Sequence, residues 1–256
     1  MSLIPLQSGI IYGPIRSRRL GRSLGVNLFP SDKKICSYDC VYCHFGATTD
    51  HRLECLGARV PSVREVLEAV EAHLKSDHEF EFVTLSGNGE PTMYPQFVEL
   101  IPKLKQLISR IRPSVRLVLL SNSSTATRSA LQKTLSQIDL PVFKLDAGDQ
   151  VTFELLNRPC PGIAIDDIIK GLARLATRAK LVLQTVMVSG LVRNWEGAPF
   201  DAWVKAVKTI KPDQIQLYTT DRPVADRRVE KVTPEQLEQI AARARELTGI
   251  KIEAYY

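Results

Sequence analysis

Six short apolar segments alternate with helical patterns along this chain, and this alternation constrains its fold more than any other feature. The apolar segments end near residues 28, 86, 121, 146, 188 and 218. Strands that alternate with crossover helices build a parallel sheet with right-handed connections. The sequence therefore predicts an α/β fold: a partial (β/α)6 barrel with a curved parallel sheet, in a single domain.

Capping signals define two of the predicted helices. Ser62 and Glu65 have the spacing of a capping box before an apolar helical face. A second box begins at Thr233, and the helix that it opens is expected to end at Gly249. A further helical pattern over residues 95–110 contains a proline, Pro102, which predicts a kink or a break in that helix.

The chain divides into three predicted parts. Residues 1–21 are rich in proline and glycine turns, and they predict a basic leader that is poorly ordered or wraps the core. Residues 22–220 form the barrel core. Residues 221–256 form a capping helix and a tail that can add an edge strand. No long linker rich in Pro, Gly or Ser separates these parts.

Composition limits the class of protein. Of the 256 residues, 44% are apolar and 24% are charged, which is ordinary for a globular domain with a full core. No apolar run is long enough to predict a membrane span, and the first residues lack the order of a signal peptide. The five cysteines are odd in number and partly clustered, which argues against a secreted disulfide framework. We therefore expect a cytoplasmic protein without a membrane partner.

Three cysteines follow the first predicted strand within eight residues: Cys36, Cys40 and Cys43. Thiolates are soft ligands that select zinc or the iron of iron–sulfur clusters. Three thiolates can hold three irons of a four-iron cluster, whereas electron-transfer clusters take four. The spacing therefore predicts a [4Fe–4S] cluster with one iron open to a ligand. Cys55 and Cys160 are too few for a second cluster and are interpreted as structural.

Other interpretations of this loop stay open. Structural zinc needs four ligands, and His44 or His51 would have to supply the fourth. Cys40 and Cys43 alone form a CxxC redox pair, which leaves Cys36 without a role. The thiols can also be ordinary buried side chains.

Glycines and hydrogen-bonding residues stand at the carboxyl ends of the predicted strands, where parallel α/β folds bind ligands. We expect these residues to form one site with the cysteine loop: Gly87, Gly89, Glu90, Asn122, Asp146 and Gln184. The glycines let a backbone approach a ligand closely, and Glu90 offers a carboxylate to a cation. Turn formation, helix capping and a paired buried amide are the structural alternatives for the polar residues.

The CxxxCxxC spacing, with Tyr42 before its last cysteine, and the segment Gly87–Thr92 resemble the radical S-adenosylmethionine superfamily. The resemblance extends over residues 22–220. It implies that the three cysteines ligate a [4Fe–4S] cluster whose open iron binds S-adenosylmethionine, with Tyr42 and the strand-end residues in the cofactor site. One-electron reduction would cleave the cofactor to methionine and a 5′-deoxyadenosyl radical that abstracts hydrogen from substrate.

Three short phrases are similar to the wyosine-base synthase group, which builds a tricyclic base on a guanosine of phenylalanine transfer RNA: Gly-Glu-Pro-Thr, Lys-Leu-Asp-Ala and Leu-Asn-Arg-Pro. The sequence shows no flavin domain and no cysteine set for a second cluster. No motif singles out a substrate-binding lysine, for which Lys33, Lys34 and Lys144 are candidates. The resemblance therefore predicts fold and radical chemistry better than it predicts the substrate.

A basic patch precedes the first predicted strand and consists of Arg16, Arg18, Arg19 and Arg22. Four arginines within seven residues must face water or an anion, and the phosphates of an RNA backbone are such anions. We expect an enzyme that acts on transfer RNA and takes electrons from a donor such as flavodoxin or ferredoxin. The same chemistry on a small metabolite, peptide or protein is one alternative. A non-catalytic, metal-bound RNA-binding module is the other.

Overall fold

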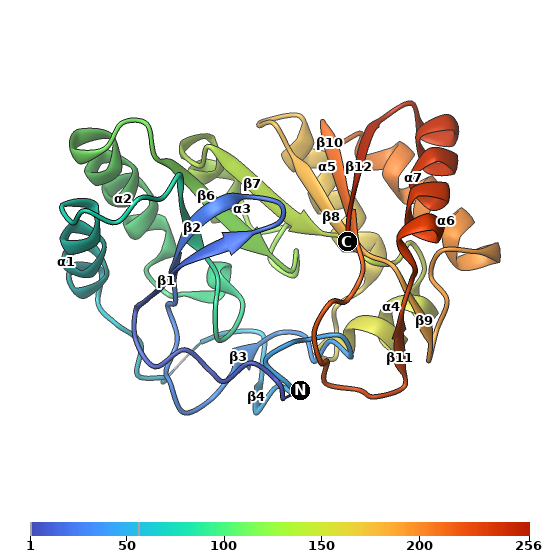
Figure 1. The fold of residues 1–256 in the computed structure, drawn as a ribbon, viewed down its shortest axis with the longest axis horizontal. Helices are drawn as coiled ribbons and strands as arrows, with labels where there is room; N and C mark the ends of the chain where they lie inside the picture. Colours follow the sequence, from blue (N-terminus) through green and yellow to red (C-terminus); the bar gives the residue numbers. More distant parts are fainter. Residues whose placement is uncertain (1, 56) are drawn as a thin grey trace.

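One eight-stranded sheet forms the centre of the computed structural model, which describes residues 2–55 and 57–256. Its strand order is β1-β2-β5-β6-β7-β8-β10-β12, and all neighbouring pairs are parallel except β1 with β2. The strands span Ile11–Ser17 (β1), Gly21–Val26 (β2), Phe82–Leu85 (β5), Arg116–Ser121 (β6), Leu140–Lys144 (β7), Val182–Val186 (β8), Gln214–Tyr218 (β10) and Lys251–Tyr255 (β12). The sheet curls into a half-barrel (Figure 1), which confirms the predicted fold class.

The six strands expected from the sequence are β2, β5, β6, β7, β8 and β10. The tail adds β12, which pairs in parallel with β10 at one edge of the sheet. Two small sheets lie outside the half-barrel. One pairs β3 (Ile35–Cys36) with β4 (Asp50–His51), and the other pairs β9 (Val188–Gly190) with β11 (Val229–Lys231).

The expected leader is more regular than its sequence indicates. Ile11–Ser17 forms β1, which pairs antiparallel with β2 at the other edge of the sheet, so this part is neither poorly ordered nor a loose wrap. The pairing register shifts between Tyr12 and Ile15, across Gly13 and Pro14. That irregularity breaks the alternation by which a strand is recognised in a sequence. Residues 2–10 do run along the core without regular structure, and Gln7 exchanges hydrogen bonds with Asn88.

Seven helices lie within the described ranges, and Figure 1 shows α1 and α2 outside one end of the sheet and α6 and α7 outside the other. They span Val63–Leu74 (α1), Phe97–Ile111 (α2), Ser129–Thr134 (α3), Gln150–Asn157 (α4), Ile165–Ala176 (α5), Gly197–Ile210 (α6) and Pro234–Thr248 (α7). Both expected capping boxes are present, at the starts of α1 and α7. None of these helices has the length and apolarity that crossing a membrane requires.

Pro102 does not break α2, so of the two expected effects, a kink or a break, the break is wrong. The helix is continuous from Phe97 to Ile111 with the proline inside it. Proline removes one hydrogen bond to the carbonyl four residues earlier. That carbonyl belongs to Val98, a residue that is 46% exposed, so water can replace the missing donor.

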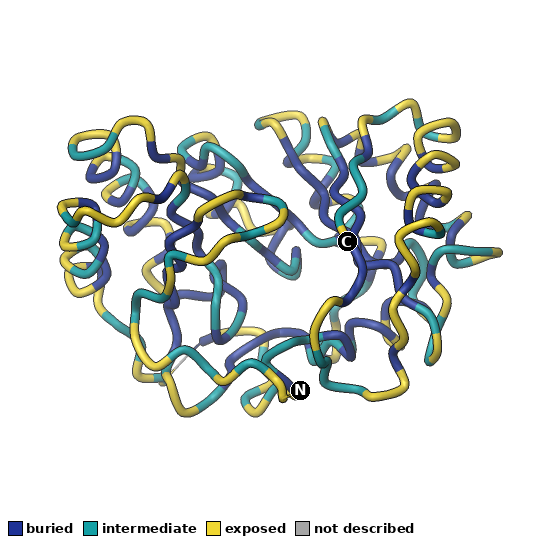
Figure 2. The backbone as a smooth tube through the Cα atoms, in the orientation of Figure 1, coloured by how far each residue is buried: buried dark blue, intermediate teal, exposed yellow. Residues whose placement is uncertain are grey.

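Polar side chains are buried mainly at the carboxyl ends of the strands. Figure 2 shows that the strands are the most buried part of the backbone and that the outer faces of the helices are exposed. Several fully or nearly fully buried polar residues lie in these strands or just after them: Asn88, Glu90, Ser121, Asp146, Gln184, Gln216 and Thr219. Burying so many polar groups requires hydrogen-bond partners for each of them. The carboxyl end of the sheet is therefore where a functional site is expected.

Candidate active site

The cysteine loop is fixed to the carboxyl end of α4 by backbone hydrogen bonds. The N–H of Val41 donates to the carbonyl of Leu156 over 2.9 Å, and the N–H of Asp39 donates to that of Asn157 over 3.1 Å. The N–H of Cys160 donates to the carbonyl of Ser37 over 2.9 Å. These bonds hold the three loop cysteines against the half-barrel.

Each thiol of the loop receives one N–H donor, and the three donors come from different parts of the chain. Asn122 Nδ2 lies 3.4 Å from the Sγ of Cys36, and Asn157 Nδ2 lies 3.5 Å from that of Cys40. Lys34 Nζ lies 3.1 Å from the Sγ of Cys43. The donors are carried by the end of β6, the last residue of α4 and the segment before β3, in that order. N–H donors at sulfur stabilise thiolate ligands.

The protonation of these thiols is set first by burial. Burial raises the pKa of Cys36 to about 12 and that of Cys40 to about 11. Both groups are therefore neutral thiols at neutral pH without a metal, and binding a metal releases their protons. Burial alone lowers the pKa of Lys34, but the sulfurs of Cys43, Cys36 and Cys40 raise it above its usual value.

The described residues do not fit the zinc interpretation. His44 Nδ1 lies 3.2 Å from the carbonyl of Pro223, and His51 Nε2 lies 3.1 Å from that of Ser37, so both rings have partners away from the thiols. Within residues 2–55 and 57–256, no three His, Cys, Asp or Glu side chains converge as a single metal ion requires. A cluster is held through separate irons, so its thiolates need not converge on one point. Three thiols with three N–H donors fit an iron–sulfur cluster better.

The glycines after β5 serve the packing of the protein itself. A Cβ at Gly89 would lie 1.8 Å from the carbonyl oxygen of Ile35, and one at Gly87 would lie 2.7 Å from Asn27 Oδ1. Gly87 also has a φ of +130°, which side-chain-bearing residues rarely adopt. The close approach expected of these glycines is therefore to the protein itself: Gly89 lies against the start of the cysteine loop, and Gly87 lies against the end of β2. It brings the two loops side by side.

Glu90 is a buried carboxylate with hydrogen bonds on both oxygens. Oε1 accepts from the backbone N–H of Thr92 over 3.0 Å, from the Thr92 hydroxyl over 2.5 Å and from the Ser121 hydroxyl over 2.9 Å. Oε2 accepts from the backbone N–H of Asn122 over 2.6 Å. Burial raises the pKa of Glu90 even though these hydrogen bonds lower it. The turn interpretation and the site interpretation both apply, because the same residue caps a short 3-10 helix, Pro91–Met93, and lines a cavity.

A cavity of about 140 Å³ joins the cysteine loop to the strand ends. Its walls include Cys36, Gly89, Glu90, Asn122 and Gln184, all of which the sequence placed in one site. The amide of Gln184 also donates to the side chain of Gln216 over 3.1 Å. The side chain of Asn122 does not cap a helix, because α3 begins only at Ser129.

A second cavity of about 410 Å³ opens on the other side of the loop. It is lined by Tyr42, Cys43 and Gly87, by the β1–β2 hairpin and by the segment that follows β10. Its walls therefore come from opposite halves of the curled sheet. The two cavities share three lining residues: Gly89, Leu120 and Lys144.

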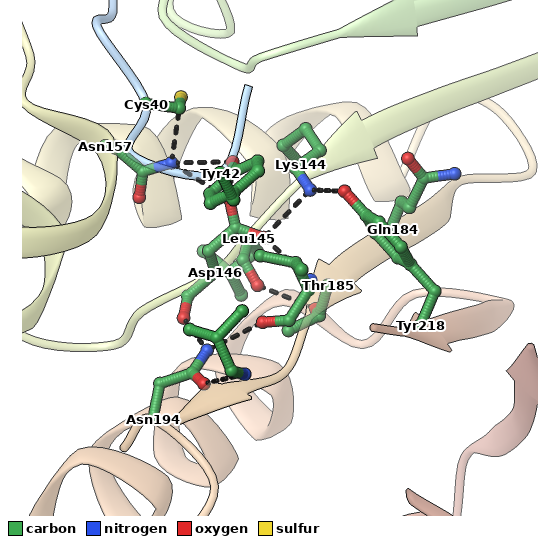
Figure 3. A network of polar contacts seen from close by, with 12 residues as sticks. Cys40, Tyr42, Lys144, Leu145, Asp146, Asn157, Gln184, Thr185, Asn194 and Tyr218 are labelled. Carbon is green, nitrogen blue, oxygen red and sulfur yellow. Dashed lines mark hydrogen bonds and ion pairs between the residues drawn. The ribbon is translucent and has the colours of Figure 1, made fainter. Parts of the chain in front are cut away.

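Asp146 lines neither of these cavities but contacts two residues of their walls, Tyr42 and Lys144 (Figure 3). Oδ1 accepts from the N–H of Val186 over 2.9 Å and pairs with Lys144 Nζ over 3.0 Å. Oδ2 accepts from the Tyr42 hydroxyl and, over 2.9 Å, from Asn157 Nδ2. Its carboxylate is thus fully occupied by protein donors. Direct cofactor binding by Asp146 stays a prediction, and its observed contacts are those of a positioning residue.

The structure brings into the site four residues that the sequence did not assign to the cluster or the cofactor. Lys34, Asn157 and Tyr218 contact the cysteines or Lys144, and Asn194 supports Asp146 through its backbone carbonyl. Two of them had a signal in the sequence: Asn157 lies in the phrase Leu-Asn-Arg-Pro that carries the family resemblance, and Lys34 is one of the candidate substrate-binding lysines. Cys55 belongs to the hydrophobic core, and Cys160 is also buried.

The four arginines of the predicted patch stay together in the β1–β2 hairpin, where Arg16 and Arg22 are cross-strand partners, but they differ in the cavity that they line. Arg16, Arg18 and Arg19 line the 410 Å³ cavity together with Cys43. Arg22 forms an exposed ion pair with Glu79 and does not line that cavity.

Known proteins and a family model are similar to this chain in sequence. The model of the radical SAM superfamily matches residues 33–198. A UPF0026 protein of Helicobacter pylori is 33% identical over 218 residues, which cover 84% of this chain and 67% of that protein. The GTPase Obg of Brachyspira hyodysenteriae is 29% identical over 236 residues, which are 91% of this chain. This chain spans only 33% of the length of that relative.

Solved structures share the fold. A structure of TYW1 with a lysine–pyruvate adduct bound aligns with a TM-score of 0.65 at 17% identity, over 89% of this chain and 74% of that chain. A radical SAM methyltransferase from Sphaerobacter thermophilus aligns with a TM-score of 0.64 at 15% identity, over 91% of this chain and 66% of that chain. The region matched by the family model covers more than half of the sequence. This chain belongs to the radical SAM superfamily.

Proposed function

We propose that Cys36, Cys40 and Cys43 hold a [4Fe–4S] cluster beside S-adenosylmethionine, and that the enzyme abstracts hydrogen from a substrate. Membership of the radical SAM superfamily implies S-adenosylmethionine and an iron–sulfur cluster. When bound, these groups take one electron and supply methionine and a 5′-deoxyadenosyl radical. A small electron carrier such as flavodoxin or ferredoxin is the proposed source of that electron.

The observation that carries this proposal is the set of three N–H···S contacts at the loop thiols. Each donor stabilises negative charge on one sulfur, which thiolate ligation of iron requires. The 140 Å³ cavity begins at one of these thiols, Cys36, and extends to Glu90. A ligand that reaches from the cluster into this cavity would meet the carboxylate directly.

The strand-end residues have distinct proposed roles. Glu90 Oε2 accepts one protein hydrogen bond, whereas Oε1 accepts three, so Oε2 is the oxygen that we assign to the cofactor ammonium. The amide of Gln184 lines the same cavity and would bind a polar group of the cofactor. Asp146 keeps Tyr42 and Lys144 in place on the cavity wall.

Iron content tests this proposal. Anaerobically reconstituted protein should hold about four irons per chain. Replacing Cys36, Cys40 or Cys43 by Ala should abolish iron binding, whereas Cys55→Ala and Cys160→Ala should retain it. A requirement for Cys55 or Cys160 as a fourth thiolate would contradict an open iron.

RNA is the substrate class that we propose for this chemistry. Support comes from Arg16, Arg18 and Arg19, which line the 410 Å³ cavity together with a cluster cysteine, Cys43. Transfer RNA is the first RNA to test, because of the sequence phrases shared with the wyosine-base synthase group. A small metabolite, a peptide or a protein remains the alternative substrate.

The salt dependence of RNA binding separates these substrate classes. The triple variant with Arg16, Arg18 and Arg19 changed to Gln should bind transfer RNA less tightly. The slope of log K against log salt should flatten by about 0.7–0.9 for each phosphate contact that is lost. Arg22→Gln is the matched control. Absence of transfer RNA binding by the parent, or an unchanged slope in the triple variant, would favour a small or peptidic substrate.

The lysines of the site do not favour covalent capture of a carbonyl compound. TYW1 has been solved with a lysine–pyruvate adduct. In this chain the lysine on the cavity wall is Lys144. Burial lowers its pKa, but Asp146 and Tyr218 raise it above the usual value, so the amine is protonated and a poor nucleophile. We therefore propose that Lys144 acts through its charge.

A further inference from the structure

The 410 Å³ cavity carries more positive charge than the cofactor explains. Five cationic side chains line it, against one carboxylate, Asp221: the cations are Arg16, Arg18, Arg19, Lys144 and Arg222. S-adenosylmethionine itself carries a sulfonium, an ammonium and one carboxylate, so its net charge is positive. A cavity of this sign therefore does not match the cofactor alone.

Three of these cations form ion pairs with carboxylates of the protein. Arg18 pairs with Asp221 over 3.3 Å, Arg222 approaches the same carboxylate at 3.9 Å, and Lys144 pairs with Asp146 over 3.0 Å. Among the described residues, Arg16 and Arg19 make no ion pair. Arg16 is exposed, whereas Arg19 is half-buried. Arg19 is thus the cation of the cavity that is both withdrawn from water and without a carboxylate.

Arg19 is nevertheless held in a defined place. Its guanidinium carbon lies 4.5 Å from the centroid of the Tyr218 ring, and the Tyr218 hydroxyl is 2.6 Å from Lys144 Nζ. Burial lowers the pKa of Arg19, as expected of a guanidinium that has lost part of its hydration. Stacking on a ring leaves the edge of a guanidinium free to donate paired hydrogen bonds to a phosphate or a carboxylate.

We propose that Arg19, stacked on Tyr218, binds an anionic group of the substrate, either a phosphate or a carboxylate. This inference rests on the proposed function, because it places the substrate in the cavity that Cys43 and Tyr42 also line. Through Tyr218 and Lys144, the anion site is connected to Asp146, which also holds Tyr42. The anionic group would therefore fix the substrate next to the cysteine loop.

The test is calorimetric titration of anaerobic, cluster-loaded protein with inorganic phosphate and, separately, with acetate, each in the presence of S-adenosylmethionine. We expect saturable binding of one of these anions with a dissociation constant on the order of 1 mM. Arg19→Met should weaken it at least about tenfold, as for loss of a charged hydrogen bond. Arg19→Lys keeps the charge without the planar fork and should recover part of the affinity. Arg22→Met, in the same hairpin but outside the cavity, should have no effect.

Several results would overturn the inference. These are no saturable binding of either anion, an equal loss in Arg22→Met, or an equal loss of S-adenosylmethionine affinity in Arg19→Met, which would assign the arginine to the cofactor. Preference for phosphate over acetate would identify a phosphorylated or nucleic-acid substrate, and a short single-stranded RNA should then compete with phosphate. If the cluster-loaded protein did not cleave S-adenosylmethionine, the proposed radical chemistry would be wrong. Anion binding could still be measured in that case.

Discussion

Lys34 Nζ donates a hydrogen bond to the Sγ of Cys43 over 3.1 Å, from a residue that is only 4% exposed. The same ammonium donates to the carbonyl of Gly46 over 2.8 Å, which fixes its position. A charge in such a buried place acts more strongly than it would in water. Reduction adds negative charge to an iron–sulfur cluster, so an ammonium at a ligand sulfur favours the reduced state. If the proposed cluster is bound, Lys34 is therefore expected to raise its reduction potential.

Lys34→Met should lower the reduction potential of the reconstituted cluster. A hydrogen bond to a charged group contributes about 1.5–3 kcal/mol, which for one electron corresponds to a shift of roughly 65–130 mV. Redox titration followed by electron paramagnetic resonance measures this shift. Lys33→Met is the matched control, because Lys33 pairs with Asp50 over 3.4 Å and makes no contact with the thiols among the described residues. Equal potentials in the parent and in Lys34→Met would remove Lys34 from this role.

Glu90→Gln should weaken binding of S-adenosylmethionine while the cluster still forms. The substitution removes the carboxylate charge from the 140 Å³ cavity. The expected loss is about ten- to hundredfold in affinity, which equilibrium binding to the cluster-loaded protein measures. An unchanged affinity would mean that Glu90 only caps the short helix that follows it.

Cofactor binding should also depend on pH through Glu90. Burial raises the pKa of this carboxyl above its usual value, so it becomes protonated at a higher pH than an exposed glutamate. Affinity for the cofactor should be full above that raised pKa and should fall as the pH drops through it. Binding measured across the acidic range should show this decline in the parent and not in Glu90→Gln. The same decline in both proteins would assign the titration to another group.

Asp146→Asn should destabilise the fold around Lys144. The substitution leaves Lys144 without its ion-pair partner and places an amide where Asn157 and Val186 both donate. Removing one partner of a buried ion pair typically costs about 3 kcal/mol or more in the free energy of unfolding. Denaturant unfolding measures it. Asp167→Asn, at an exposed ion pair with Lys170, should change stability by less than about 1 kcal/mol, and an equally small effect at Asp146 would contradict its organising role.

Local signals explain which elements were predictable. The strands β6 and β10 end where their apolar segments predicted, at Ser121 and Tyr218, and the capping box of Thr233 with Gly249 marks both ends of α7. The strand β1 was missed because Gly13 and Pro14 interrupt its alternation and its register shifts there. Only pairing with β2 identifies it as a strand.

The same distinction between local sequence signals and long-range contacts applies to the site residues. Cys36, Cys40 and Cys43 were recognisable because their spacing in one loop is itself chemical information. Contacts between residues distant in the chain carried no such signal. The donation from Asn157 to Cys40 joins residues 117 positions apart, and Arg19, between β1 and β2, meets Tyr218 of β10 in the opposite half of the sheet. For Asp146, the strand-end position was informative, whereas its hydrogen bonds depend on partners in β8 and α4.

The most direct test of the account is the amount of 5′-deoxyadenosine formed when anaerobic, reconstituted protein is reduced with S-adenosylmethionine in the absence of substrate. We predict slow formation by the parent and by Cys55→Ala and Cys160→Ala. We predict none from the variants in which Cys36, Cys40 or Cys43 is replaced by Ala. Equal formation by any of these last three variants, or none by a parent that holds its full cluster, would contradict the assignment of this loop as the catalytic centre.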